Sequence, residues 1–484
     1  MINLPIVYQA LGILLYLESL LLAGCMCFGL WAGETDLLMF GVPALVAIVL
    51  GILLRVAGRH ADPHMDRRDG FLIVSLTWVV FSLVGMLPWL VSGWQPRVAA
   101  AFFETMSGFS TTGATVMTHI DSLPRSLLLW RSITHWLGGM GIVFFTIALL
   151  PNMGGDLKLF AAEATGLKVG KLHPRIGTTA RWLWSLYFML TMGGAVCYFA
   201  AGMNWFDAIN HAMSTVATGG FSTHQESLAY FHSPAIEWVA VGFMLLAGTN
   251  FTLLYLFFVK RRMRDVLRDG ELRLYLCIFA ISTVVSATLV AWHGHAPWYD
   301  AIRLGAFYSI SMQSTTGLTL VDYMAWPTCP WLLFTIAGII GACAGSTSGG
   351  IKCIRVLTTM KIIKTEFKQT LHPHAVLPIR VNNTTIRSQV ARSIFVFLSL
   401  YGLLVMAGVI VFCAMDMPLL DAFGLCLSAI NNVGPCVGYV VSPTGAWDVL
   451  NDAQLWILSF LMLAGRLEIF SILLPFTAAF WREE

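Results

Sequence analysis

The segment Ser110-Thr111-Thr112-Gly113-Ala114-Thr115 is a short polar strip in a chain that is otherwise dominated by long apolar runs. Three related strips follow it: Ala217-Thr218-Gly219-Gly220-Phe221-Ser222, Ser314-Thr315-Thr316-Gly317-Leu318-Thr319 and Asn431-Asn432-Val433-Gly434-Pro435-Cys436. We take their glycines as equivalent: Gly113, Gly219, Gly317 and Gly434, which are 106, 98 and 117 residues apart. Recurrence at such similar intervals indicates an internal fourfold repeat.

Each strip follows a short apolar segment. These segments are residues 98–110, 206–217, 301–314 and 421–431. About 10–14 residues are too few to cross a bilayer, which takes about 20, and a free loop would be less apolar. Three segments carry an acid followed by alanine near their start, which suits the N-terminus of a helix: Asp207, Asp300 and Asp421. We therefore predict four short re-entrant helices, each leading into a strip.

The composition of the whole chain is that of a membrane protein. Of its 484 residues, 57% are hydrophobic and only 11% are charged, whereas about 25% are charged in a typical soluble protein. Ten long apolar runs predict ten membrane crossings, and they leave no room for a large catalytic domain outside the membrane. The predicted spans are residues 7–30, 37–58, 71–93, 127–150, 182–202, 236–259, 274–292, 331–360, 393–414 and 454–480.

Basic residues alternate sharply between the connecting loops. The loops 55–68, 158–181, 260–273 and 361–392 hold four, five, six and six Lys or Arg residues. The intervening loops hold almost none. Loops rich in Lys and Arg stay in the cytoplasm, so the bias predicts that both termini are cytoplasmic and that the strips lie on the outer side.

Together these patterns predict an all-α polytopic membrane protein. Its four pseudo-fourfold repeats each contain a span, a pore helix, a filter strip and a second span, and two extra transmembrane helices precede them. The predicted units are an N-terminal two-helix unit at 1–69 and repeats at 70–155, 156–265, 266–375 and 376–484.

The strips have the chemistry of a cation filter. Glycine permits backbone torsions that let successive carbonyl oxygens face one axis, and rings of such carbonyls replace the hydration shell of K⁺ in potassium channels. The alternative is that the small residues only pack helices together, but four copies on one side of the membrane favour a pore. The predicted K⁺ ligands are the backbones of Thr111, Thr112, Gly113, Ala217, Thr218, Gly219, Thr315, Thr316, Gly317, Asn432, Val433 and Gly434.

The predicted eighth span, 331–360, is too long for one crossing. Thirty residues make about 45 Å of helix, against a hydrocarbon core of about 30 Å, and the middle of the span is the Gly- and Ser-rich run 341–352. We predict that the helix breaks there into an irregular loop under the filter. Two alternatives are tight GxxxG helix packing through Gly341, Gly345 and Gly349 and a phosphate-binding loop, whose GxxxxGK[ST] order is absent.

Two charged residues lie in apolar surroundings. Arg466, near the middle of the tenth predicted span, costs about 2.5–3.5 kcal/mol to insert and must face something polar. It is either a fixed positive charge beside the pore or half of a packing salt bridge, whose partner must come from another span because Glu468 faces elsewhere on the helix. Glu104, on the first short helix, either attracts cations to the filter or bonds neighbouring backbone.

With these features the sequence resembles the membrane subunits of Trk-type potassium uptake systems, in the superfamily that also contains the Ktr and plant HKT transporters. The Ser-Thr-Thr-Gly strips, the Gly-rich run of the third repeat and the Arg of the last span carry the resemblance, which covers essentially the whole chain. Its departures are Ala217 and the Asn432-Val433 pair. In that superfamily serine at the first filter glycine accompanies sodium permeation, so glycine in all four strips favours potassium.

The resemblance implies a homodimer in the inner membrane of a bacterium, with one pore per protomer and a cytoplasmic nucleotide-binding regulatory subunit of the TrkA type. It also implies an intramembrane gate made by Gly345, Ser346, Thr347, Ser348, Gly349, Gly350, Lys352 and Arg466. Lys352 and Arg355 are expected to tie the loop to the cytoplasmic subunit.

We therefore predict uptake of K⁺, which is the transported ion, by a subunit that needs no organic cofactor. The sequence shows no nucleophile–base pair and no paired catalytic carboxylates, which predicts that the protein is not an enzyme, and a net charge of +3 gives no indication of nucleic-acid binding. One alternative is an alternating-access transporter of a small solute or anion, which usually has inverted repeats. Another, a purely structural subunit, leaves the four glycines unexplained.

Overall fold

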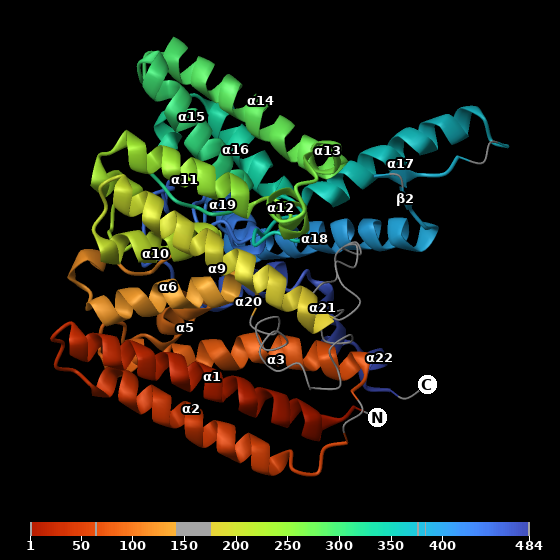
Figure 1. Ribbon diagram of the computed structural model, residues 1–484. Coiled ribbons are helices and arrows are strands. Elements are labelled where there is room, and N and C mark those ends of the chain that lie inside the picture. Colours follow the sequence, from red (N-terminus) through yellow and green to blue (C-terminus); the bar gives the residue numbers. More distant parts are fainter. Residues whose placement is uncertain (1, 63–64, 142–175, 375–376, 383, 483–484) are drawn as a thin grey trace.

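A computed structural model describes residues 2–62, 65–141, 176–374, 377–382 and 384–482. The described chain is almost wholly helical (Figure 1), which confirms the predicted all-α class. Its one addition is a small antiparallel hairpin of β1 (Arg380–Val381) and β2 (Thr384–Thr385). Both termini lie at the same end of the helices (Figure 1), and we call the opposite end the mouth end.

The first two helices, α1 (Leu4–Trp31) and α2 (Leu38–Ala57), form an antiparallel pair at the side of the molecule. Each is long and apolar enough to cross a membrane, and α1 packs against the first helix of the repeat region, α3 (Arg67–Gly85). Apolar residues around the whole of α1 and α2 explain why both helices remain stable with one face toward lipid.

Four similar units follow, and in each a long helix precedes a short pore helix and a returning helix. The first unit contains α3, α4 (Leu87–Val91), α5 (Val98–Phe109), η1 (Ile120–Ser122) and α6 (Arg125–Gly139). The second contains α9 (Ile176–Ala200), α10 (Trp205–Val216), η2 (Ser227–Phe231), α11 (Pro234–Ala247), α12 (Phe251–Phe258) and α13 (Met263–Leu267).

The third unit contains α14 (Gly270–Trp292), α15 (Trp298–Gln313), η3 (Tyr323–Ala325), α16 (Thr328–Ile340) and α17 (Cys353–Leu371). The fourth contains α18 (Ser388–Ala414), α19 (Leu419–Asn431), α20 (Asp452–Arg466), α21 (Phe470–Leu473), η4 (Leu474–Phe476) and α22 (Ala478–Trp481). The pore helices of the four units are α5, α10, α15 and α19.

Several returning helices are broken, including two that the sequence predicted as continuous. Six described helices are long and apolar enough to span a membrane, and two more candidate spans are bent pairs: α11 with α12 at 103° and α20 with α21 at 117°. The predicted break of 331–360 is present, between α16 and α17. Of the predicted span 127–150, residues 142–150 lie outside the described part. An apolar sequence indicates that a segment lies in lipid, but it does not show in which direction the helix axis runs. The two bends could therefore not be predicted from the sequence.

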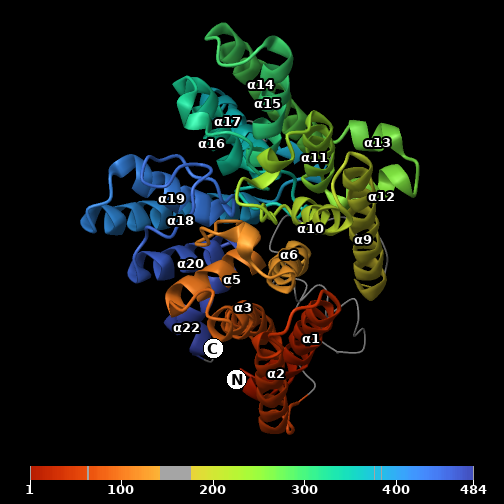
Figure 2. The same cartoon turned by 90° about the vertical axis from the view of Figure 1, so that its left-hand side faces the viewer.

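The four units are arranged in chain order around a common centre (Figure 2). Each pore helix packs against the returning helix of the unit before it: α10 against α6, α15 against α11, α19 against α16 and, closing the circle, α5 against α20. This circular packing brings the four strips, which come from distant parts of the sequence, to the centre of the fold.

Candidate functional site

The four strips form a closed ring in which each glycine lies against a carbonyl of the next strip. A Cβ atom added to any of these glycines would collide with that carbonyl oxygen. The distances from the ideal Cβ position are 2.1 Å from Gly113 to Gly219 O, 2.3 Å from Gly220 to Thr316 O, 1.9 Å from Gly317 to Val433 O and 2.5 Å from Gly434 to Thr112 O. Only glycine fits at these four positions.

The ring shows that the predicted register of the second strip is wrong by one residue. The glycines with positive φ are Gly113, Gly220, Gly317 and Gly434, at 80°, 89°, 73° and 93°. The residues two before them also have positive φ, of 56°, 54°, 55° and 55°: Thr111, Thr218, Thr315 and Asn432. The counterpart of Gly113 is therefore Gly220 and not Gly219, and Ala217 precedes the equivalent three residues. A Gly-Gly pair offers two registers, and only the backbone conformation distinguishes them.

A serine in each pore helix fixes this register and is the signal that the sequence analysis missed. This serine lies six residues before the ring glycine of its unit. Its backbone carbonyl accepts a hydrogen bond from the residue that immediately precedes that glycine. The bonds are Thr112 N to Ser107 O at 2.9 Å, Gly219 N to Ser214 O at 2.8 Å, Thr316 N to Ser311 O at 2.9 Å and Val433 N to Ser428 O at 3.0 Å. Three of the serine hydroxyls also donate to the outgoing strip: Ser107 to Ala114 O, Ser311 to Leu318 O and Ser428 to Gly434 O, at 2.6–2.8 Å.

Three residues before the serine, the pore helices carry different side chains at an equivalent position. The Glu104 carboxylate accepts from Val116 N at 2.9 Å, His211 Nε2 lies 2.9 Å from Ser222 Oγ, and the Tyr308 hydroxyl accepts from Leu320 N at 2.8 Å. Each therefore holds the chain that leaves its own strip. The fourth position is Leu425, whose side chain cannot hydrogen-bond. In this unit Asp421, one turn earlier in the pore helix, accepts instead from Tyr439 N and Val440 N at 2.6 Å.

Glu104 is part of a buried ion pair and not a surface attractant for cations. Its carboxylate and the Arg131 guanidinium are 3.0 Å apart, and both side chains are almost fully buried. Arg131 also donates to Ser222 O at 2.9 Å and lies 4.0 Å from the centre of the Phe221 ring. Of the two alternatives for Glu104, bonding to neighbouring backbone is therefore confirmed. Through Arg131 the pair joins the first strip to the second.

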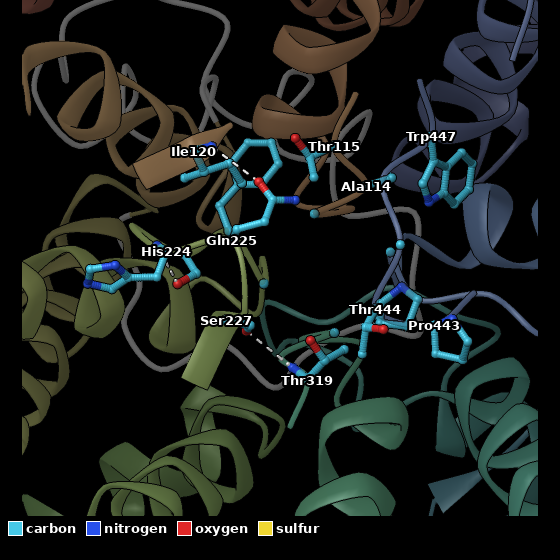
Figure 3. A pocket seen from close by; sticks show the side chains of 18 of the residues that line it. Ala114, Thr115, Ile120, His224, Gln225, Ser227, Thr319, Pro443, Thr444 and Trp447 are labelled. Atoms are coloured by element: carbon cyan, nitrogen blue, oxygen red, sulfur yellow. Dashed lines mark hydrogen bonds between the residues drawn. The ribbon is translucent and has the colours of Figure 1, made fainter. Parts of the chain in front are cut away.

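A vestibule of about 60 Å³ lies on the mouth side of the ring, lined by Gly113, Gly220, Gly317 and Gly434 of the four strips. Hydrogen bonds between neighbouring units surround it (Figure 3). Ile120 N donates to Gln225 Oε1 at 3.1 Å between units one and two, Thr319 N donates to Ser227 Oγ at 3.3 Å between units two and three, and Trp447 N donates to Thr115 O at 2.7 Å between units four and one. Among the described residues, no such bond joins the mouth-end loops of units three and four.

His224 lies at the edge of the vestibule (Figure 3) between two carboxylates. Its Nδ1 is 2.8 Å from Asp121 Oδ1, its Nε2 is 3.1 Å from Asp207 Oδ2, and its ring stacks on Tyr230 with centroids 3.5 Å apart. Partial burial lowers the pKa of His224, but hydrogen bonds and charges of Asp207 and Asp121 outweigh it and raise the pKa above its ordinary 6.5.

On the other side of the ring, the loop 341–352 forms a floor under the strips. Gly349 N donates to Thr315 Oγ1 at 2.7 Å, and a Cβ on Gly349 would lie 2.1 Å from Asn431 O. Thr347 Oγ1 donates to Val216 O at 3.1 Å. The loop therefore contacts units two, three and four directly beneath their strips. Its residues are not helical, so the alternative of a continuous GxxxG packing helix is wrong.

Arg466 completes the floor toward the first unit. It is the last residue of α20, where the helix bends, and not the middle of a straight span. Its guanidinium donates to Thr347 O at 2.8 Å and to Gly139 O at 2.9 Å, and also to Gly138 O. Arg466 is thus held at least partly by carbonyl groups of the loop and of α6, next to the first strip.

Both ends of the loop are tied to the rest of the chain by residues that the sequence analysis did not identify. Glu271 Oε1 accepts from Ala344 N at 2.6 Å and from Ile354 N at 3.1 Å, and Phe251 N donates to Gly345 O at 2.9 Å. An acid in the first turn of a helix usually serves that helix alone, so Glu271 gave no signal of a distant role.

Lys352 and Arg355 do not extend toward the outside of the protein as expected. Both are buried. Lys352 folds back onto the Ser348 carbonyl, while Arg355 pairs with Glu468 at the bend after α20 and lies 4.2 Å from the centre of the Phe397 ring. Lys352 therefore bonds within the loop itself, whereas Arg355 joins the end of the loop to the fourth unit of the same chain.

Comparisons with known proteins agree with this architecture. Residues 42–483 match the family TrkH, described as cation transport protein. The chain is 37% identical to the Trk system potassium uptake protein TrkH of Halomonas elongata, covering 99% of this chain and 100% of that protein. It is 38% identical to TrkH of Escherichia coli K12, covering 90% and 91%, and 36% identical to TrkG of the same organism, covering 99% of both. The crystal structure of the potassium transporter TrkH from Vibrio parahaemolyticus superimposes with a TM-score of 0.89 at 35% identity, covering 98% and 99% of the two chains.

Proposed function

Because this chain belongs to the TrkH family of cation transport proteins, we propose that it is the potassium-conducting subunit of a Trk uptake system. It is a multi-pass membrane protein, and its characterised relatives are transporters and not enzymes. The ion would cross the membrane through the ring of four strips.

The closed ring of glycines and carbonyls is the observation that carries this proposal. Carbonyl oxygens that replace the water around a cation must surround it on all sides, and the four strips do surround one axis. In the corrected register the ligands are the backbones of Thr111–Gly113, Thr218–Gly220, Thr315–Gly317 and Asn432–Gly434. Glycine at all four crowded positions keeps the ring symmetrical, which suits a single spherical cation.

The floor would be the gate. The loop residues 345–350 close the path below the ring, and the guanidinium of Arg466 places a positive charge there, which opposes a cation in a region of low dielectric constant. Opening requires the loop to leave Asn431 and the guanidinium of Arg466 to leave the carbonyls of Gly138 and Gly139. Lys352 would hold the loop in its closed form through Ser348.

The remaining assembly follows from the relatives, which belong to a multi-component system. We propose a homodimer in the bacterial inner membrane, with both termini and the basic loops in the cytoplasm. A cytoplasmic nucleotide-binding subunit of the TrkA type would regulate the gate. An alternating-access transporter is disfavoured, because the four units follow one another around a single axis (Figure 2) and do not form an inverted pair.

The proposal is tested by ⁸⁶Rb⁺ uptake into proteoliposomes with K⁺ or Na⁺ as competitor. Gly113→Ser should weaken the preference for K⁺, because the new side chain meets the Gly219 carbonyl. The control is Gly242→Ser in α11, where a Cβ meets nothing within 4 Å. Unchanged selectivity in Gly113→Ser would reject the filter.

A further inference from the structure

The fourfold packing of the molecule is incomplete at one place, between units three and four. Three pore helices pack extensively against the returning helix of the preceding unit: α5 against α20, α10 against α6 and α15 against α11. The fourth pair, α19 against α16, touches over a much smaller region. In a pseudo-symmetric ring this is where the protein leaves space.

That space is a cavity of about 220 Å³ with an almost wholly apolar lining. Leu332, Thr335 and Gly338 of α16 form one wall, and Phe423 and Leu427 of α19 form the other. Leu332 and Phe423 are 47% and 40% exposed, so the cavity opens on the outer surface of the helices and not into the vestibule.

The inner end of the cavity is the fourth strip itself. Val433 and Pro435, on either side of the ring glycine Gly434, line it. Beside this strip Leu425 replaces the hydrogen-bonding side chains of the other three pore helices, and Asp421 holds the outgoing chain only further on, at Tyr439 N and Val440 N. In addition, among the described residues no hydrogen bond joins the mouth-end loops of units three and four.

A molecule that fills this cavity must be apolar and must enter from the side of the helices, at the level of the pore helices. The surrounding helices of this membrane protein face hydrocarbon, and a cavity with so few polar groups does not bind water favourably. An empty cavity would forfeit the dispersion contacts that its lining could make. We propose that this cavity binds one lipid acyl chain, which replaces the missing helix contact and supports the fourth strip from behind.

Binding can be tested without any transport measurement. The probe is a phosphatidylethanolamine with a diazirine in the middle of one acyl chain, reconstituted with the full-length protein and mapped by peptide mass spectrometry. We expect labelling on α16 and α19 within the cavity and loss of that labelling in Thr335→Phe, which fills the cavity. The proposal is overturned if these helices are unlabelled in the wild type, or are labelled only when dimers are dissociated, since a second copy would then cover the face.

The chain offers a closely matched control for Thr335→Phe. Thr288 lies exposed on α14, and its hydroxyl donates to the carbonyl four residues earlier at 2.8 Å, as that of Thr335 does. Thr288→Phe should leave the cavity labelling unchanged; equal loss in both variants would overturn the assignment. Gly338→Ala provides a milder second variant, since its Cβ would be 3.4 Å from Met312 O and 3.6 Å from Val433 Cγ2, and it should reduce labelling near Val433.

The effect on the fourth strip rests on the proposed filter and needs a second readout. Wild-type K⁺ over Na⁺ selectivity should differ between short-chain and long-chain phosphatidylcholine vesicles, and Thr335→Phe should abolish that difference while Thr288→Phe retains it. Equal lipid dependence in both variants would overturn the supporting role. A wild type that binds the lipid probe but conducts no K⁺ would instead refute the proposed function and leave the lipid site standing.

Discussion

Gly434 of the fourth strip lies against the carbonyl oxygen of Thr112 in the first, so that the ring of strips closes on itself. The two residues are 322 positions apart in the sequence, and a Cβ on Gly434 would be only 2.5 Å from that oxygen. The same contact recurs between each pair of consecutive strips. A single chain therefore builds a complete ring without contribution from another subunit.

The corrected register makes Gly220 a ring residue, and its substitution should damage the filter. In Gly220→Ala the Cβ would lie 2.3 Å from Thr316 O, at a φ of 89° that L residues rarely adopt; such strain costs about 1–3 kcal/mol. We expect ⁸⁶Rb⁺ uptake with weakened discrimination against Na⁺. Gly242→Ala, which meets no neighbour within 4 Å, is the control, and equal selectivity in the two variants would contradict the register.

The buried Glu104–Arg131 pair should be important for stability. Arg131→Met leaves a buried carboxylate without its partner, a change that typically costs about 3–5 kcal/mol. The exposed pair Arg97–Asp452, at 2.6 Å, is the matched control, because surface pairs contribute about 0–1 kcal/mol. Thermal unfolding in detergent should show a clearly lower Tm for Arg131→Met than for Arg97→Met. Similar Tm values would mean that Arg131 is not needed to balance Glu104.

If Arg466 is an electrostatic barrier, removing its charge should raise basal transport. A unit charge about 4 Å from an ion path opposes a cation by about 4 kcal/mol at an effective dielectric constant of about 20, so we expect at least about a tenfold rise for Arg466→Gln. Arg466→Lys keeps the charge but loses the forked contact with Thr347 and Gly139. In this variant basal transport should rise much less. Rates of ⁸⁶Rb⁺ uptake without a regulatory subunit would decide, and equal rates in the two variants would exclude a purely electrostatic role.

His224 should make the mouth end of the protein more stable at acidic pH. Its pKa is raised above 6.5 in the folded protein by Asp207 and Asp121, and the other groups facing it are the Tyr230 ring and, through Asp207, His211. The stabilisation is therefore fully present below pH 6.5 and is lost as the pH rises through the folded-state pKa.

The check compares Tm for the wild type and His224→Gln across this pH range. Their difference should shrink as the pH increases. The control is His293→Gln, at an exposed residue whose ring, among the described residues, bonds only the Leu289 carbonyl of its own helix, and it should show no such trend. A difference between wild type and His224→Gln that is independent of pH would mean that the charged form of His224 does not stabilise the fold.

Much of the architecture could be predicted from the sequence because it depends on local composition. Long apolar runs define the spanning helices, and the Gly- and Ser-rich run 341–352 marks the break under the ring, since neither residue type sustains a helix in competition with a loop. The recurrence of Thr and Gly at similar intervals predicts four equivalent units. The apolar runs and the Gly- and Ser-rich run can each be read within a window shorter than one unit, and the repeat follows from comparing such windows along the chain.

The tertiary structure decided what depends on neighbours from other units. Gly219 and Gly220 are equally good candidates in the sequence, and only the approach of Gly220 to Thr316 O shows which one belongs to the ring. The partners of Arg466 come from Thr347 and α6, far away along the chain. The small contact area between α16 and α19 cannot be predicted from the sequence of either helix alone. Composition and periodicity determine which environment a residue prefers, whereas a ring, a floor and a gap exist only once separate units pack around one axis.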